Sequence, residues 1–154
     1  FVLLDSQGKE FDSKRLEGKV WAADFIFTTC GGICPVMTNN MARLYRSFLT
    51  AKDVSLVSFS VDPDHDSPRV LKEYAKKHDA DPSRWFFLTG AKDTISDLAI
   101  RSFKMGSAQA PVVHSPHFTL IDRRMRIRGF YEGTDDARVA ALKEDIAGLI
   151  RDRD

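Results

Sequence analysis

Short apolar runs alternate along this chain with segments in which apolar residues recur at helical spacing. VWAADFIF, at 20–27, has the length and composition of a buried strand. A helical pattern follows, and Pro35 suits its first position. VSLVSFSV, at 54–61, predicts a second strand, and Ser67 is placed to cap a second helix. This part of the chain is therefore predicted to form a strand, a helix, a second strand and a second helix, in that order.

The same alternation continues toward the C-terminus. A strand is predicted at 84–88 and a helix at 93–103, then a hairpin of 117–122 with 126–131, and finally a helix at 135–150. Strands joined by helices require right-handed crossovers, which give a largely parallel sheet with helices on both faces. The hairpin adds an antiparallel edge. The sequence thus predicts an α/β fold with a mixed central sheet.

The composition is that of one globular domain. The 154 residues are 43% hydrophobic and 29% charged, and no repeat or linker divides them, so we expect a single domain over 1–154. The net charge of +1 is spread along the chain, which disfavours nucleic acid and anionic membranes as partners. The chain starts at Phe1 without a signal sequence, and we expect it to be processed or trimmed.

The chain has only two cysteines, Cys30 and Cys34, in the loop after the first predicted strand. A disulfide between them closes a very small loop, where the stabilisation is least, so a purely structural disulfide is disfavoured. If Pro35 is the first helical residue, Cys34 lies at the N-cap, where the positive end of the helix favours a thiolate. A thiolate binds metals and also attacks disulfides. Both roles remain open, as does a pair of buried, inert cysteines.

Other polar residues are expected at the same edge of the sheet. The carboxyl ends of parallel strands meet at one edge, so Asp62, which follows the second strand, should lie near the cysteines. An antiparallel strand that starts near Phe118 brings the preceding loop, with His114, to this edge as well. His117 is a second choice as a ligand. Asp62 either supports the site or simply starts a turn with Pro63.

The type and number of these ligands favour copper over zinc. Two thiolates and one imidazole form a soft, three-ligand site that suits Cu(I). Structural zinc normally requires four protein ligands in closely spaced pairs, which this sequence lacks. Met37 and Met41 are helically spaced and fit a core-facing stripe better than a copper relay.

Three segments resemble the Sco/SenC family of thioredoxin-like copper proteins. They are DFIFTTCGGICPVMTNNMARL, VSFSVDPDHDSPRVLKEYA and HSPHFTLID, which resemble the family's CxxxCP, SVDPxxDTPxxLxxY-like and HSxxxYLID-like patterns. The resemblance implies a thioredoxin-like three-layer α/β/α fold with an N-terminal β-hairpin, for which 1–12 is the candidate. It also implies that Cys30, Cys34 and His114 correspond to the copper ligands, with Asp62 close to them.

The sequence departs from the family pattern at two places. Gly31 and Gly32 follow the first cysteine, where many members have proline next, and we expect a more mobile loop. Val113 stands where many members have an aspartate before the ligand histidine, which leaves open what orients His114. Neither departure removes a ligand.

The resemblance implies a copper metallochaperone, holding Cu(I) or Cu(II), that delivers copper to the CuA site of cytochrome c oxidase or matures that site. Its expected partner is the copper-site subunit of the oxidase or another copper protein. The alternative is a thiol-disulfide oxidoreductase that reduces the recipient's cysteines, for which His114 is dispensable; a thiol peroxidase is a third hypothesis. The resemblance also implies a membrane-anchored protein at the periplasmic face of the bacterial inner membrane, or in the mitochondrial intermembrane space of a eukaryote.

Overall fold

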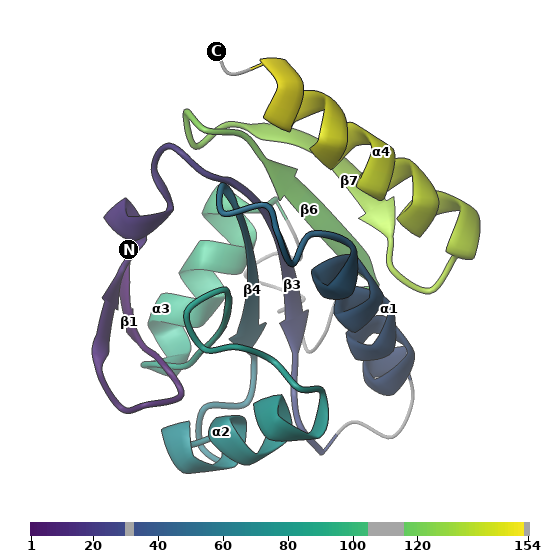
Figure 1. The fold of residues 1–154 in the computed structure, drawn as a ribbon. Coiled ribbons are helices and arrows are strands. Elements are labelled where there is room, and N and C mark those ends of the chain that lie inside the picture. The colour runs from purple at the N-terminus through teal and green to yellow at the C-terminus, as the bar shows by residue number, and fades with distance from the viewer. Residues whose placement is uncertain (30–32, 105–115, 153–154) are drawn as a thin grey trace.

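The computed structural model describes residues 1–29, 33–104 and 116–152, with only the backbone of Ile33 and Cys34. In chain order its elements are β1 (Val2–Leu4), β2 (Glu10–Asp12), a 3-10 turn (Ser13–Leu16), β3 (Val20–Ile26), α1 (Ile33–Ser47), β4 (Val54–Ser60), α2 (Pro68–Lys77), β5 (Trp85–Leu88), α3 (Lys92–Asp97), a π-helical turn (Leu98–Ser102), β6 (His117–Ile121), β7 (Ile127–Glu132) and α4 (Asp136–Asp152) (Figure 1). The predicted alternation of strands and helices is confirmed.

The central sheet has five strands in the order β5-β4-β3-β6-β7. β3 is parallel to β4 and β4 to β5, whereas β6 is antiparallel to β3 and β7 to β6. Ile26 lies opposite Ser60, so β3 and β4 end at the same edge. Ala23 pairs with Thr119, and β6 therefore starts near the edge where β3 ends. The predicted mixed sheet and its antiparallel hairpin are confirmed.

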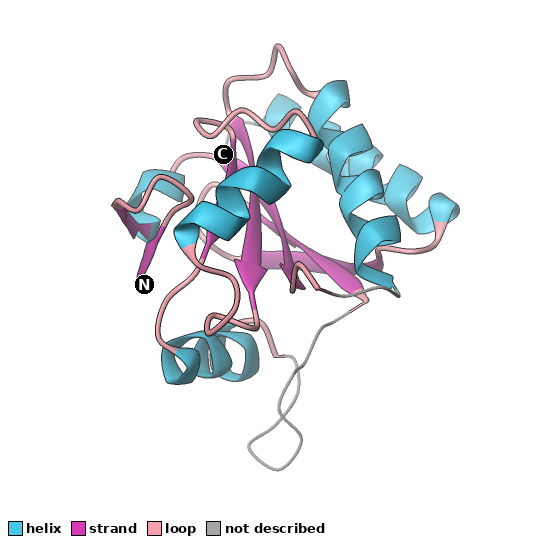
Figure 2. Cartoon of the chain, turned by 90° about the horizontal axis from the view of Figure 1, so that it is seen from below, coloured by secondary structure: helices cyan, strands magenta, loops and turns pink. Residues whose placement is uncertain are grey.

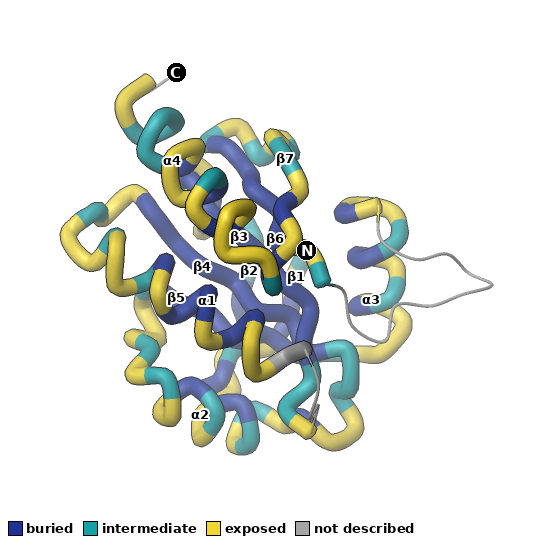
Figure 3. The backbone as a smooth tube through the Cα atoms, turned by 90° about the vertical axis from the view of Figure 1, so that its right-hand side faces the viewer, coloured by how far each residue is buried: buried dark blue, intermediate teal, exposed yellow. Residues whose placement is uncertain are grey.

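Both faces of this sheet are covered, which gives three layers. α1, α2 and α4 pack on one face, and α3 with the N-terminal hairpin packs on the other (Figure 1). All residues of β3 and β4 are buried, whereas the helices turn exposed residues outward (Figure 3). Met37 and Met41 of α1 are fully buried in the first face's core, as their spacing predicted. The three-layer α/β/α architecture follows from this packing.

The segment 1–12 forms the predicted N-terminal hairpin, with β1 antiparallel to β2. It is bonded to the end of β5, because the Leu4 amide donates to the Thr89 carbonyl at 2.8 Å and the Thr89 amide donates to the Leu4 carbonyl at 2.9 Å. Phe11 is fully buried, and its ring lies 4.7 Å from that of Phe86. The hairpin therefore completes the core on its side of the sheet.

The predicted helix over 93–103 is α-helical only in its first part. The Phe103 amide donates to the Leu98 carbonyl at 3.1 Å, five residues back, and closes the wider π-helical turn. This turn sets the Phe103 ring 5.3 Å from Phe25 and 5.5 Å from Phe59 in an aromatic cluster. The change from α-helical to π-helical hydrogen bonding therefore coincides with the packing of Phe103 against Phe25 and Phe59.

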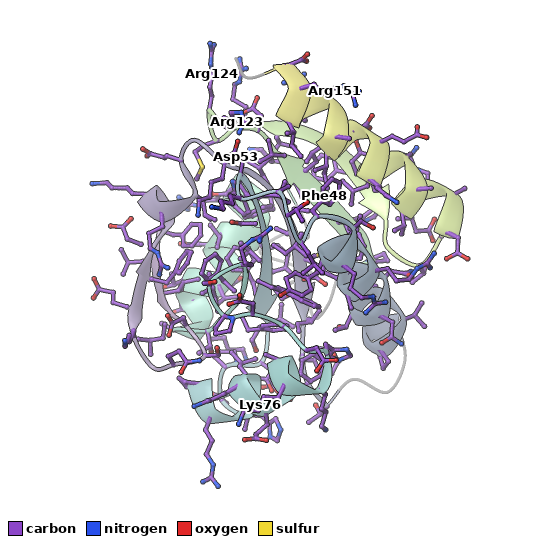
Figure 4. All side chains as sticks on the ribbon, in the orientation of Figure 1. Phe48, Asp53, Lys76, Arg123, Arg124 and Arg151 are labelled. Atoms are coloured by element: carbon purple, nitrogen blue, oxygen red, sulfur yellow. The ribbon has the colours of Figure 1, made fainter. Side chains whose placement is uncertain are left out.

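Arg84 fixes the segment that follows α1. Its guanidinium donates to the carbonyls of Phe48 at 2.6 Å, Ala51 at 2.7 Å and Leu49 at 2.8 Å. These carbonyls belong to the turn between α1 and β4. One side chain thus holds this turn and the entry to β4. Phe48 is labelled beside α1 in Figure 4.

Arg123 joins further segments at the same end of the sheet, beside the entry to β4. Its guanidinium donates to the Gly18 carbonyl at 3.3 Å and the Ile150 carbonyl at 3.2 Å, and it pairs with Asp53 at 3.6 Å (Figure 4). The turn between β6 and β7 is thereby joined to the start of β3 and the end of α4.

None of the helices in the described ranges is long and apolar enough to cross a membrane.

Candidate metal and redox site

The predicted site lies at the edge where β3 and β4 end. Figure 2 looks onto this end of the molecule. The Val61 amide donates to the Ile26 carbonyl at 2.8 Å, so the two strands stay paired as they leave the sheet. The segment that leads to Cys30 and the segment that contains Asp62 therefore start side by side.

Asp66 holds these two segments together. It is fully buried, and its carboxylate accepts hydrogen bonds from the Thr28 amide at 3.1 Å, the Thr28 hydroxyl and the Ser60 hydroxyl at 2.7 Å. Thr28 is two residues before Cys30 in the chain. Because a buried carboxylate is costly unless hydrogen-bonded, these contacts are expected to contribute strongly to the shape of the loop.

Asp62 was predicted from the sequence to lie near the site, whereas Asp66 was not. Asp62 is half-buried, and its carbonyl accepts from the amides of His65 at 3.1 Å and Asp66 at 2.8 Å, which makes it the start of a turn. Its carboxylate forms no hydrogen bond with the described residues, so a supporting role at the site stays a prediction. The available signal for Asp66 was its place in the segment SVDPDHDSP, where it matches the second aspartate of the SVDPxxDTP-like pattern.

α1 begins at Ile33, earlier than predicted. Pro35 is its third residue and not its first, and Cys34 is the second residue of the helix instead of its N-cap. Proline is tolerated throughout the first turn, because the amide that it lacks has no partner inside the helix. Cys34 still lies at the positive end of α1. Its side chain is outside the described part of the structure.

The other two predicted ligands, Cys30 and His114, lie outside the described residues, as do Gly31, Gly32 and Val113. The strand after His114 is placed as expected, because β6 starts at His117 and runs antiparallel to β3. His117 is exposed and pairs in register with Glu132. Within the described ranges, no three His, Cys, Asp or Glu side chains form a metal-binding group. The ligand set therefore stays a prediction.

A second buried carboxyl, Asp24, lies in β3 and was not selected from the sequence. It is fully buried on the face covered by α1, and the Ser58 hydroxyl donates to its Oδ1 at 2.5 Å. The Trp85 indole in turn donates to the Ser58 oxygen at 3.1 Å. Asp24 Oδ2 has no hydrogen-bond partner among the described residues. Burial raises the pKa of Asp24 from 3.8 to about 7, although the Ser58 hydrogen bond opposes this rise.

The family model for SCO1/SenC matches residues 1–151. The chain belongs to the SCO1/SenC family. Its structure is similar to that of a SCO1/SenC family lipoprotein from Bacillus anthracis, with a TM-score of 0.85 and 38% identity over 97% of this chain and 92% of that one. The resemblance inferred from the three sequence segments is confirmed, and with it the thioredoxin-like fold.

Two further SCO structures are similar to this chain. BsSco, a member of the Sco family of cytochrome c oxidase assembly proteins in which a disulfide switch was identified, is 33% identical, with a TM-score of 0.83 over 98% of this chain and 91% of its own. Arabidopsis thaliana ScoI, whose structure has copper bound, is 30% identical, with a TM-score of 0.78 over 99% and 96% of the two chains.

Proposed function

We propose that this SCO1/SenC protein is a copper metallochaperone that holds copper through Cys30, Cys34 and His114. Its proposed role is to deliver copper to the CuA site of cytochrome c oxidase, or to prepare that site. Copper bound to the Arabidopsis relative supports the choice of metal, and the membership of BsSco among oxidase assembly proteins supports the choice of recipient.

The pairing of the strands carries the ligand assignment. β3 lies between β4 and β6, so the segment after β3 and the segment before β6 meet the sheet at one edge. The first contains both cysteines and the second contains His114. Two thiolates and an imidazole are suited to Cu(I), and the first turn of α1 favours the thiolate of Cys34.

Transfer proceeds by ligand exchange in this proposal. A thiolate of the recipient displaces one sulfur while the other sulfur and His114 retain the ion. The recipient's thiols must be reduced for this exchange, so copper delivery and disulfide chemistry are coupled. The contacts of Asp66 with Thr28 hold the chain two residues before Cys30.

The experiment is an anaerobic Cu(I) competition titration of the wild type with Cys30→Ser, Cys34→Ser and His114→Ala. Each substitution removes one ligand, and we expect affinity to fall at least about tenfold, or about 1.4 kcal/mol. His117→Ala is the matched control, since it alters a histidine three residues away. Unchanged affinity in His114→Ala contradicts the assignment. A loss confined to His117→Ala moves the imidazole ligand to that position.

A thiol-disulfide oxidoreductase is the second candidate function. The disulfide switch of BsSco favours it, as does the position of Cys34 at the positive end of α1. In this role the cysteine pair reduces the recipient's disulfide and becomes oxidised itself. His114→Ala separates the two functions, because it removes a copper ligand and leaves both thiols. Retained disulfide exchange together with lost copper binding shows that the two activities are separable.

The cellular location belongs to the same proposal. We infer a membrane-anchored protein at the periplasmic face of the bacterial inner membrane, or in the mitochondrial intermembrane space if the source is eukaryotic. The Bacillus anthracis relative is a lipoprotein, which supports anchoring. Fractionation of cells that express the full-length protein tests this, and recovery from the soluble cytosol contradicts it.

A further inference from the structure

A cleft of about 520 Å³ lies beside the predicted copper site. It runs between the segment that follows β3 and helix α2, which lies beyond the ends of β3 and β4 in Figure 1. Residues from both sides line it, among them Thr28, Thr29, His65, Arg69, Tyr74 and Lys77. Cys30 follows Thr29 directly in the chain, so a molecule bound in this cleft is next to the cysteine segment.

The α2 side of the cleft is positively charged. Arg69 and Lys77 are exposed, and neither has an ion pair within the described part of the chain. Glu73 is the one carboxylate among the described residues that line the cleft, and it already lies 4.0 Å from Lys76 of the same helix. α2 also carries Lys72, so its formal charge is positive. This wall therefore favours an anionic ligand.

The rest of the lining is largely polar. Thr29 and Ser67 contribute hydroxyl groups, and Tyr74 contributes an aromatic ring with a polar end, whereas the Thr28 hydroxyl already donates to Asp66. Asp62 and Asp64 belong to the loop that carries His65, but they do not line the cleft. The lining thus combines cations, hydroxyl donors and an aromatic surface, which is a combination suited to an acidic polypeptide segment.

We propose that this cleft docks an acidic segment of the recipient protein and thereby presents the recipient's cysteines to the Cys30/Cys34 pair. The inference rests on the proposed function, since it assumes a recipient that exchanges ligands or disulfides with this pair. Arg69 and Lys77 select the partner by charge.

The probes are two short peptides, each with one cysteine activated as a mixed disulfide with 2-thiopyridine. Glutamates flank the cysteine in one peptide and lysines in the other. A protein thiolate attacks the peptide sulfur and pyridine-2-thione leaves; the second protein thiolate then releases the peptide thiol and forms the intramolecular disulfide. Two protein thiols are oxidised and one activated disulfide is reduced. Release of the thione reports the rate.

We expect the reduced wild type to react several-fold faster with the acidic peptide than with the basic peptide at low ionic strength, and salt should diminish the difference. Arg69→Gln/Lys77→Gln should lower the rate with the acidic peptide by about threefold or more, because two favourable charge pairs are lost. The charge-preserving variant Arg69→Lys/Lys77→Arg should retain most of the preference. Reaction with neutral 2,2′-dithiodipyridine should stay unchanged in both variants.

Arg124→Gln/Arg151→Gln is the matched control for net charge. Both arginines lie at the opposite end of the molecule from Lys76 and α2 (Figure 4). An equal loss in this control assigns the preference to the overall charge and overturns the cleft proposal. A wild-type preference that survives Arg69→Gln/Lys77→Gln also overturns it. Cu(I) titration of the same proteins tests the proposed function separately from the peptide assay. If the wild type binds no copper, the proposed function is refuted, but the peptide rates still decide whether the cleft selects an acidic segment.

Discussion

Asp24→Asn is expected to remove a pH dependence of stability that originates inside the sheet. Asp24 is fully buried in β3, and burial raises the pKa of its carboxyl to about 7. Asparagine has nearly the same shape, and its oxygen can still accept the hydrogen bond that Ser58 donates to Oδ1. The substitution therefore removes the titration and retains most of the packing.

The sign follows from the two pKa values. Between pH 3.8 and about 7 the unfolded chain loses the proton of Asp24 and the folded chain keeps it, so stability falls as pH rises. Below pH 3.8 the contribution is fully present, and above about 7 no more is lost. At 1.36 kcal/mol per pH unit, the total loss is about 4 kcal/mol, of which ~2.5 kcal/mol falls between pH 5 and 8.

Urea unfolding followed by tryptophan fluorescence at pH 5, 6, 7 and 8 measures this difference, with both cysteines alkylated in all samples. The asparagine amide gains a buried donor at the position of Oδ2, which has no hydrogen-bond partner among the described residues, and this costs about 1–3 kcal/mol at every pH. The diagnostic quantity is therefore the change in the difference between the two proteins. We expect Asp24→Asn to gain ~2.5 kcal/mol relative to the wild type from pH 5 to 8.

Asp64→Asn is the control, because Asp64 is an exposed aspartate near the same edge of the sheet. Its stability should run parallel to that of the wild type over this pH range. If the curves of Asp24→Asn and the wild type are also parallel, Asp24 does not change its protonation between pH 5 and 8, and the reasoning from burial is refuted.

Three further substitutions test other contacts. Ser58→Ala removes the hydroxyl that donates to the carboxylate of Asp24, so the pKa of Asp24 should rise further and stability should keep falling to higher pH in the same urea series. Arg84→Met removes the donors to the carbonyls after α1, and urea unfolding should show a loss of about 2–3 kcal/mol, less in Arg84→Lys. Asp66→Ala leaves the Thr28 amide and hydroxyl without their acceptor; we expect a loss of about 3 kcal/mol and faster hydrogen exchange at Thr28, and unchanged exchange there contradicts its role in fixing the loop.

Periodicity in the sequence predicted most of the fold, because the burial of whole faces leaves a strong pattern. The runs at 20–27 and 54–61 became β3 and β4, and Ser67 caps α2 by accepting from the Val70 amide at 3.3 Å. The π-helical turn after α3 was not predictable in this way, because the same apolar residues face inward in either helical form. The start of α1 was also misplaced, since proline fits more than one position of a first turn.

The site was predicted less completely, because its supporting residues depend on contacts between distant segments. Cys30, Cys34 and His114 were selected by their chemistry and by the family pattern, and they stay predictions. Asp66 acts through Thr28, 38 positions earlier in the chain, and Asp24 through Ser58, 34 positions later. No local pattern encodes such pairs. A buried carboxylate inside an apolar strand is nevertheless a usable signal, because its cost requires a partner.

The polar residues in β3 and β4 show why this edge of the sheet can support chemistry. Asp24, Ser58 and Ser60 are buried on the face covered by α1, although strands covered on both faces are normally apolar. Ser58 bonds to Asp24, and Ser60 bonds to Asp66, which also holds the segment before Cys30. The polar groups therefore form two adjoining hydrogen-bonded sets that reach from the sheet to the base of the cysteine segment. Their desolvation cost is therefore concentrated at the end of β3 and β4, next to the segment that leads to Cys30.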